Sequence, residues 1–221
     1  MPGPRPSVPE AMEIEMSGPV VIVLAAGRGS RFRGLDHKLA QSLGASSVLG
    51  TTLAQVLASH LPMVVVTTAA LADIARRSIA TRDIVVLPDH EPVEGQPFGM
   101  GHSIASGVGA RPDAAGWLVL PGDMPLVKPA SLLAVARDLR QHTVAYAQYR
   151  GQRGHPVGFA AELYSELAAL AGDDGARRLL ARYPAHGVEV DDPGVLMDID
   201  TEADLEALRS VSLAGAAAQA R

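Results

Sequence analysis

The chain has 221 residues, 48% of them hydrophobic, and is therefore long enough to bury the core of one domain. A formal net charge of -5 disfavours polymeric nucleic acid as a partner, and the absence of cysteine excludes disulfides and thiolate chemistry, as is typical of a cytoplasmic protein. The longest apolar run, 20–26, is shorter than the roughly 20 residues of a membrane-spanning helix, so no membrane partner is predicted.

The two ends of the chain differ in composition from its middle. The first 18 residues combine four prolines with three glutamates and lack the apolar centre of a signal peptide, so 1–18 is predicted to be a disordered leader. The segment 213–221 is rich in alanine and is predicted to be a flexible tail. One folded domain is therefore expected over 19–212.

Short β-branched segments alternate with segments of helical spacing along this domain. Strands are predicted, in chain order, at 20–24, 63–68, 84–87, 117–120, 143–149, 156–159, 188–190 and 196–199, and helices at 52–59, 71–80, 103–109, 131–139, 163–171 and 176–183. Thr201, with Asp204 three residues later, is expected to cap a last helix. The alternation predicts an α/β fold, a doubly wound three-layer α/β/α domain with a mostly parallel sheet.

A glycine-rich loop follows the first predicted strand. Gly27 and Gly29 lie where a backbone can approach phosphate, and Arg31 and Lys38 follow as counter-charges. The loop therefore has the composition of a triphosphate site. The alternative is that the glycines only relieve a tight turn while both cations are solvated.

Two better-known phosphate loops fit this segment less well. A P-loop requires Gly-Lys-Ser or Gly-Lys-Thr, whereas Lys38 lies between His37 and Leu39. The dinucleotide fingerprint requires a third glycine at a fixed spacing and an acid at the end of the second strand, which here ends in two threonines. Both readings are therefore disfavoured.

Carboxylates follow other predicted strands. Asp123 comes directly after the strand at 117–120 and is expected at the same sheet edge as the glycine loop, where it could hold Mg²⁺ against phosphate, although an aspartate in such a turn is often only a turn former. Asp198 and Asp200 would share one face of a strand and are candidate further metal ligands. Asp200 could instead help to start the last helix.

Five ordered motifs together resemble the MobA-like NTP transferases of molybdenum cofactor biosynthesis, over residues 20 to 208. The motifs are Leu24-Ala25-Ala26-Gly27-Arg28-Gly29-Ser30-Arg31-Phe32 with Lys38, Gly99-Met100-Gly101-His102-Ser103, Pro121-Gly122-Asp123-Met124-Pro125, Arg153-Gly154-His155-Pro156-Val157 and Asp198-Ile199-Asp200-Thr201. The resemblance implies a fold like that of the nucleotide-diphospho-sugar transferases.

The resemblance also implies roles for individual residues. Arg31, Lys38 and Asp123 would be catalytic, Arg153 and His155 would face the acceptor, and Asp123 would bind Mg²⁺. The nucleotide would be bound by Leu24, Ala25, Ala26, Gly27, Gly29, Arg31, Lys38, Gly99 and Ser103. His155 could equally be a structural turn residue before Pro156.

The expected reaction is a Mg²⁺-dependent transfer of CMP from CTP to the terminal phosphate of molybdopterin, with release of pyrophosphate. Ala26 favours CTP, because the resemblance links Leu-Ala-Gly-Gly at this position to guanylyltransferases. The alternatives are GTP as the nucleotide, a sugar 1-phosphate as the acceptor, or a nucleotide-binding chaperone that delivers the cofactor. A molybdoenzyme or its chaperone is a possible protein partner.

Overall fold

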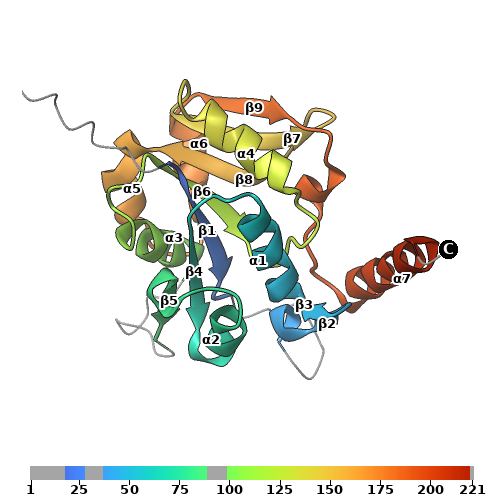
Figure 1. Cartoon of the computed structure of the whole chain (residues 1–221). Coiled ribbons are helices and arrows are strands. Elements are labelled where there is room, and N and C mark those ends of the chain that lie inside the picture. Colours follow the sequence, from blue (N-terminus) through green and yellow to red (C-terminus); the bar gives the residue numbers. More distant parts are fainter. Residues whose placement is uncertain (1–17, 28–36, 89–98, 220–221) are drawn as a thin grey trace, which may run out of the picture.

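The computed structural model describes residues 18–27, 37–88 and 99–219, with side chains described as far as residue 210. A seven-stranded sheet of order β5-β4-β1-β6-β8-β7-β9 runs through the described part (Figure 1). Its strands are β1 (Val20–Ala25), β4 (Met63–Thr68), β5 (Ile84–Leu87), β6 (Gly116–Pro121), β7 (Val144–Tyr149), β8 (Gln152–Ala160) and β9 (Ala185–Glu189). Only β8 is antiparallel to its neighbours, which confirms the mostly parallel sheet.

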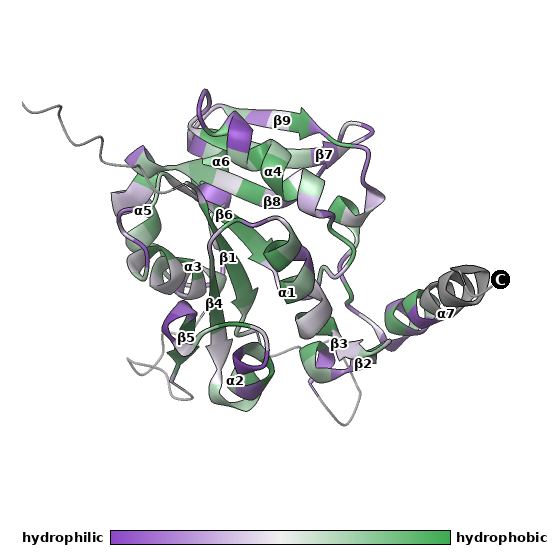
Figure 2. Ribbon diagram, in the orientation of Figure 1, coloured by the Kyte–Doolittle hydropathy of each residue, from purple (hydrophilic) through white to green (hydrophobic). Residues whose placement is uncertain are grey.

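Helices cover both faces of the sheet because the central strands are apolar on both sides. Val21 and Val23 belong to one core with residues of α1 (Val48–Ala58), α2 (Ala69–Arg76) and α4 (Pro129–Asp138). Val20 and Ile22 belong to the other core, with residues of α3 (Met100–Gly109), α5 (Tyr164–Ala168) and α6 (Arg177–Arg182). Figure 2 shows the hydrophobic strands β1, β4 and β6 between these layers. The three-layer α/β/α prediction is confirmed.

Several short elements complete the described fold. They are the 3₁₀ turns η1 (Lys38–Ala40), η2 (Thr81–Asp83), η3 (Ala161–Leu163) and η4 (Pro193–Leu196), and the two-residue strands β2 (Ser42–Leu43) and β3 (Ser46–Ser47). β7 and β8 are joined by a two-residue turn in which Arg150 and Gly151 have φ of 50° and 74°, as a type I′ hairpin requires. This hairpin makes β8 antiparallel.

The strand predicted at 196–199 is wrong. Pro193 begins η4 instead, and the Asp192 side chain accepts a hydrogen bond from the amide of Gly194 (3.0 Å). Beyond this turn, Ile199 is buried and donates its amide to the carbonyl of Asp123 (3.0 Å), which lies in a turn and not in a strand. Local capping and one long-range contact therefore override the strand character of this segment.

The last helix, α7 (Glu202–Gln219), begins where the sequence predicts. The Thr201 amide donates to Asp204 Oδ2 (2.8 Å), and the Asp204 amide donates to Thr201 Oγ1 (3.2 Å), so the expected cap is confirmed. Arg209 ties the helix to β2 through the carbonyl of Ser42 (2.8 Å). The predicted leader lies almost wholly outside the described residues, and the tail prediction at 213–221 remains a prediction. Among the helices described, none is both long and apolar enough to cross a bilayer.

Candidate active site

The ends of β1 and β6 lie side by side at the carboxyl edge of the sheet. Their register pairs Leu24 with Pro121, so the segments that follow both strands emerge together. The Gly122 amide donates to the carbonyl of Leu24 (2.8 Å), and a Cβ at Gly122 would come within 3.0 Å of the same oxygen. The Thr52 hydroxyl holds the other side of this turn by donating to the carbonyl of Gly122 (2.9 Å). The turn therefore presents Asp123 at a fixed place.

Lys38 lies between two carboxylates that are distant in sequence. Its Nζ is 2.5 Å from Asp123 Oδ2 and 3.2 Å from Asp200 Oδ1. The side chains of Lys38 and Asp123 are each 14% exposed. Burial favours a lower pKa for Lys38, but its hydrogen bonds and charge interactions with Asp123 and Asp200 outweigh burial and raise the pKa above 10.5. The ammonium is therefore charged at neutral pH.

Asp123, Asp198 and Asp200 form a group of three carboxylates. One oxygen from each lies within 4.8 Å of the others, and the Ile199 amide contact with Asp123 holds the last two beside the first. Asp123 Oδ1 is buried and has no hydrogen-bond partner among the described residues, which is unfavourable unless a cation satisfies it. An all-oxygen donor set with an unsatisfied buried oxygen fits Mg²⁺ or Mn²⁺. The predicted metal-binding carboxylates are thus brought together, although the strand expected to align two of them is absent.

Asp192, which the sequence analysis did not single out, holds the chain segment that carries Asp198 and Asp200. Its buried carboxylate accepts from the Lys128 amide (2.8 Å), the Ser131 hydroxyl (2.7 Å) and the Gly194 amide (3.0 Å). It therefore caps η4 and binds the first turn of α4 with the same side chain. The cap on Gly194 is local and an Asp before a Pro could have indicated it, but the contacts with Lys128 and Ser131 span more than 60 residues and have no local signal.

His37 was also missed. Its Nε2 lies 2.8 Å from the carbonyl of Gly27, and its Nδ1 accepts from the Leu39 amide (3.2 Å). In the neutral tautomer with the proton on Nε2, the ring satisfies both contacts and caps η1, which begins with Lys38. His37 thereby links the end of the glycine loop to its start. Gly29 and Arg31 lie outside the described residues.

The other predicted nucleotide-binding residues are placed by β1 and α3. Leu24 and Ala25 end β1, and Ala26 follows it. Gly99 is the N-cap of α3, where a Cβ would come within 2.1 Å of the backbone of Gly172, so close packing explains the glycine. Buried Ser103 donates its amide to the carbonyl of Gly99 (3.3 Å). Because α3 ends shortly before β6 begins, its N-terminus faces the carboxyl edge of the sheet.

Arg153 and His155 line a pocket of about 350 Å³ that adjoins the carboxylates. Its lining residues are Pro121, Met124, Gln152, Arg153, Gly154, His155, Val195, Leu196 and Asp198. The Arg153 guanidinium lies over the Tyr146 ring, with Cζ 4.3 Å from the ring centroid, which fixes its direction. Burial lowers the pKa of His155 despite the opposing effects of the Val119 backbone, Asp123 and Asp198. His155 is therefore neutral at pH 7.

This arrangement of an α/β fold with polar loops at one sheet edge is that of a nucleotidyltransferase with the nucleotide-diphospho-sugar transferase fold. The chain belongs to the MobA-like NTP transferase domain family, whose model matches residues 21–188. It is 30% identical over 207 residues to the purine catabolism protein PucB of Bacillus subtilis (strain 168). The match covers 85% of this chain and 94% of PucB.

Two solved structures have a similar fold. A nucleotidyl transferase from Methanothermobacter thermautotroptrophicus (Mth528) matches with a TM-score of 0.72 and 25% identity, over 90% of this chain and 99% of that one. Rv0371c of Mycobacterium tuberculosis H37Rv, in complex with manganese, matches with a TM-score of 0.68 and 28% identity, over 88% of this chain and 98% of that one. A divalent metal is therefore found with a relative of the same fold.

Proposed function

We propose that this protein transfers CMP from CTP to the terminal phosphate of a molybdopterin-type acceptor, with Mg²⁺ and release of pyrophosphate. The observation that carries the proposal is that two parts of the site with different charges adjoin one another. The group formed by Lys38 and the three carboxylates meets a pocket lined by Arg153 and His155, and Asp198 belongs to both. A triphosphate and a phosphate acceptor have complementary places there.

The chemistry requires no side-chain nucleophile or general base. A terminal phosphate monoester has a second pKa near 6, so the acceptor is mostly dianionic at pH 7. Its oxygen attacks the α-phosphorus of the nucleotide, and the bond from that phosphorus to the bridging oxygen of pyrophosphate breaks. The barrier is the approach of two polyanions, so the protein contributes by neutralising charge and fixing an in-line geometry.

Lys38 is the described cation best placed for the nucleotide. It is charged, mostly buried and held at the carboxyl edge by Asp123 and Asp200. We assign it to the triphosphate together with Arg31, and we assign nucleotide contacts to Leu24, Ala25, Ala26, Gly27, Gly29, Gly99 and Ser103. Ala26 at the end of β1 is the basis for preferring CTP to GTP.

Asp123, Asp198 and Asp200 are the residues that would hold the metal. The buried, unpartnered Oδ1 of Asp123 supports this assignment, as does the all-oxygen donor set. When bound, Mg²⁺ supplies electrostatic stabilisation of charge on the phosphate oxygens. The carboxylates fix its position through the turn after β6 and the contact of the Ile199 amide with the carbonyl of Asp123.

Arg153 and His155 are assigned to the acceptor. A planar guanidinium matches phosphate oxygens in a bidentate geometry, and stacking on Tyr146 holds it at the pocket wall. In the neutral imidazole the hydrogen bond to the Val119 backbone uses the one N–H, and the buried Nδ1 can accept a hydrogen bond from the body of the acceptor. The pocket therefore suits a phosphate carried on a larger uncharged body.

A pyrophosphate-release assay tests this function. Four reactions combine CTP or GTP with molybdopterin or a sugar 1-phosphate, each with and without Mg²⁺. The expected result is Mg²⁺-dependent release that is fastest with CTP and molybdopterin. Preference for GTP would reject the assignment based on Ala26, and preference for a sugar 1-phosphate would reject the acceptor. Nucleotide binding by calorimetry without any release would instead indicate a cofactor-delivery chaperone.

A further inference from the structure

Two histidines and an aspartate meet at the sheet edge opposite the candidate active site. Asp138 is the last residue of α4, His142 lies between α4 and β7, and His186 is the second residue of β9. β7 runs parallel to β9 and, through β8, parallel to β6. The three residues therefore lie near the starts of strands, whereas Asp123 follows the end of one.

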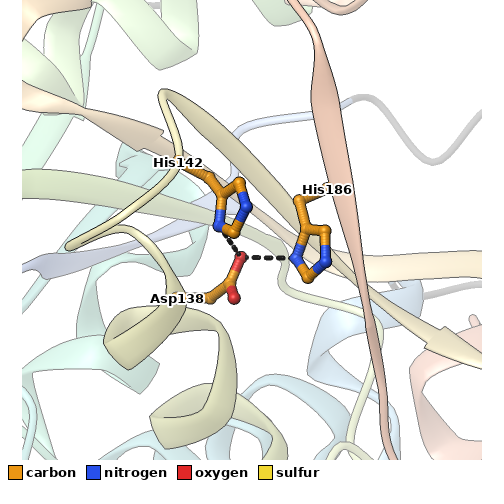
Figure 3. A group of neighbouring side chains, drawn as sticks. All are labelled: Asp138, His142 and His186. Carbon is orange, nitrogen blue, oxygen red and sulfur yellow. Dashed lines mark hydrogen bonds and ion pairs between the residues drawn. The ribbon is translucent and has the colours of Figure 1, made fainter.

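In both imidazoles the same nitrogen lies next to one carboxylate oxygen, as Figure 3 shows. The Nδ1 atoms of His186 and His142 lie 2.8 Å and 3.0 Å from Asp138 Oδ2. The rings are stacked, with centroids 4.0 Å apart and planes at 5°. Stacking and the shared oxygen hold three potential ligand atoms within 4.8 Å of one another.

Hydrogen bonds within this group leave one of its two imidazole Nδ1 atoms without a partner. His186 Nδ1 is hydrogen-bonded to Asp138, but within the described part of the chain the buried Nδ1 of His142 has no hydrogen-bond partner despite its distance of 3.0 Å from the carboxylate. The distance permits a hydrogen bond and the direction does not. A buried imidazole nitrogen without a partner is unfavourable, and this nitrogen lies within 4.8 Å of the other two ligand atoms.

We propose that Asp138, His142 and His186 bind a Zn²⁺-class transition-metal ion. Two imidazole nitrogens and one carboxylate oxygen suit Zn²⁺, whereas the all-oxygen group at Asp123 suits Mg²⁺ or Mn²⁺. Metal–ligand distances of about 2.0 to 2.2 Å in a tetrahedron separate ligand atoms by about 3.4 Å. Each Nδ1 therefore has to move away from Asp138 Oδ2 by only about 0.5 Å, and the stacked rings have to turn so that both nitrogens point at the ion. Both rings then carry their proton on Nε2 and coordinate through Nδ1.

Three protein ligands leave one position for water or another small ligand. The side chain of His186 is 49% exposed, so solvent reaches the site, while that of Asp138 is only 19% exposed and is held by its helix. The ion would join the end of α4 to β9, which is the edge strand of the sheet and is bonded to β7 alone. It would stabilise this edge and take no part in nucleotidyl transfer.

Co²⁺ and Zn²⁺ titrations of the full chain without a histidine tag test the proposal. Wild-type protein is expected to give the ligand-field absorption of Co²⁺ bound to nitrogen, and Zn²⁺ is expected to displace Co²⁺ and raise the melting temperature. His186→Gln, on the exposed edge strand, and Asp138→Asn should each weaken Zn²⁺ affinity by about tenfold or more. Mg²⁺-dependent nucleotidyl transfer by His186→Gln should match that of the wild type.

Two controls locate the metal. His60→Asn removes a histidine outside the group, so it should keep the Co²⁺ spectrum. Asparagine suits this position because it readily adopts the positive φ of 59° found there. Asp123→Asn should also keep it, because that residue belongs to the opposite edge. Unchanged Co²⁺ spectra and Zn²⁺ affinity in both His186→Gln and Asp138→Asn would overturn the proposal, as would a wild-type protein that binds neither ion.

Discussion

Lys38 forms ion pairs with two of the carboxylates that are assigned to the metal. Its ammonium balances Asp123 and Asp200 in the described structure, at distances of 2.5 and 3.2 Å. The ammonium repels a divalent ion that approaches these carboxylates. A bound triphosphate attracts the ammonium. Binding of nucleotide with metal would therefore redistribute the contacts of Lys38 from carboxylate to phosphate.

Lys38→Ala should consequently have opposite effects on turnover and on metal binding. Loss of a charge-assisted phosphate contact costs about 1.5 to 3 kcal/mol, or roughly 10- to 150-fold in turnover. In the absence of nucleotide, Mn²⁺ should bind more tightly, as measured by calorimetry, because the competing ammonium is gone. Lys128→Ala is the matched control, since Lys128 is exposed and its Nζ contacts only the carbonyl of Asp191 among the described residues. Wild-type turnover in Lys38→Ala would contradict its phosphate role.

Asp123→Asn separates a metal ligand from a turn former. The amide keeps the shape of the side chain, and the backbone contacts of the turn with Leu24 and Ile199 do not involve it. We expect turnover to fall by about 100-fold or more, a higher Mg²⁺ requirement and a nearly unchanged melting temperature. Asp73→Asn alters an exposed carboxylate paired with Arg76 and serves as the control. A variant as active as the wild type at low Mg²⁺ would remove Asp123 from the site.

At the scale of elements, Asp192 determines where the segment with Asp198 and Asp200 lies. Asp192→Asn replaces one acceptor oxygen by an amide group that cannot accept from the Lys128 and Gly194 amides at once. We expect the free energy of unfolding to fall by about 1 to 3 kcal/mol and the Mg²⁺ requirement to rise. Denaturant unfolding and a Mg²⁺ titration of turnover measure the two effects.

The neighbouring residue provides the control for this prediction. Asp191 is exposed, and only its backbone carbonyl contacts Lys128, so Asp191→Asn should resemble the wild type in both measurements. If Asp192→Asn lost stability with no change in Mg²⁺ dependence, Asp192 would support the fold without positioning the carboxylates.

Hydrophobic periodicity sufficed to predict the elements whose conformation does not depend on a specific distant contact. The strands at 63–68 and 84–87 have the predicted bounds. The first is a β-branched run buried on both faces, and the second is a β-branched edge strand that is only partly buried. It failed at 196–199, where the cap by Asp192 and the contact of Ile199 with Asp123 decide the conformation. Likewise, the position after a parallel strand predicted the sheet edge that carries Asp123. The caps made by His37 and Asp192 are local, but their contacts with Gly27 and with Lys128 and Ser131 depend on the fold.

At the scale of the whole molecule, His155 links the acidity of the solvent to global stability. Its pKa in the folded state lies below 6.5, so below pH 6.5 the unfolded chain binds more protons than the folded chain. The contribution of neutral His155 to the free energy of unfolding is complete above pH 6.5 and is lost as the pH falls towards the folded-state pKa. His155→Gln should therefore flatten the dependence of the unfolding free energy on pH below 6.5.

Denaturant unfolding at several pH values between 5 and 8 measures this effect. An equal slope in His155→Gln and the wild type would mean that the imidazole is as readily protonated in the folded protein as in the unfolded chain.

The reversed direction of β8 has a consequence for how such a domain can diversify. Because β8 is antiparallel, Arg153 and His155 lie near its start yet reach the edge at which β1 and β6 end. They depend on the two-residue hairpin at Arg150 and Gly151, whereas Lys38 and Asp123 depend on connections elsewhere in the chain. Under the proposed assignment of Arg153 and His155 to the acceptor, grafting a different hairpin onto this sheet would exchange the recipient of the nucleotide while the donor half stayed intact, so new specificities could arise by recombining one short segment.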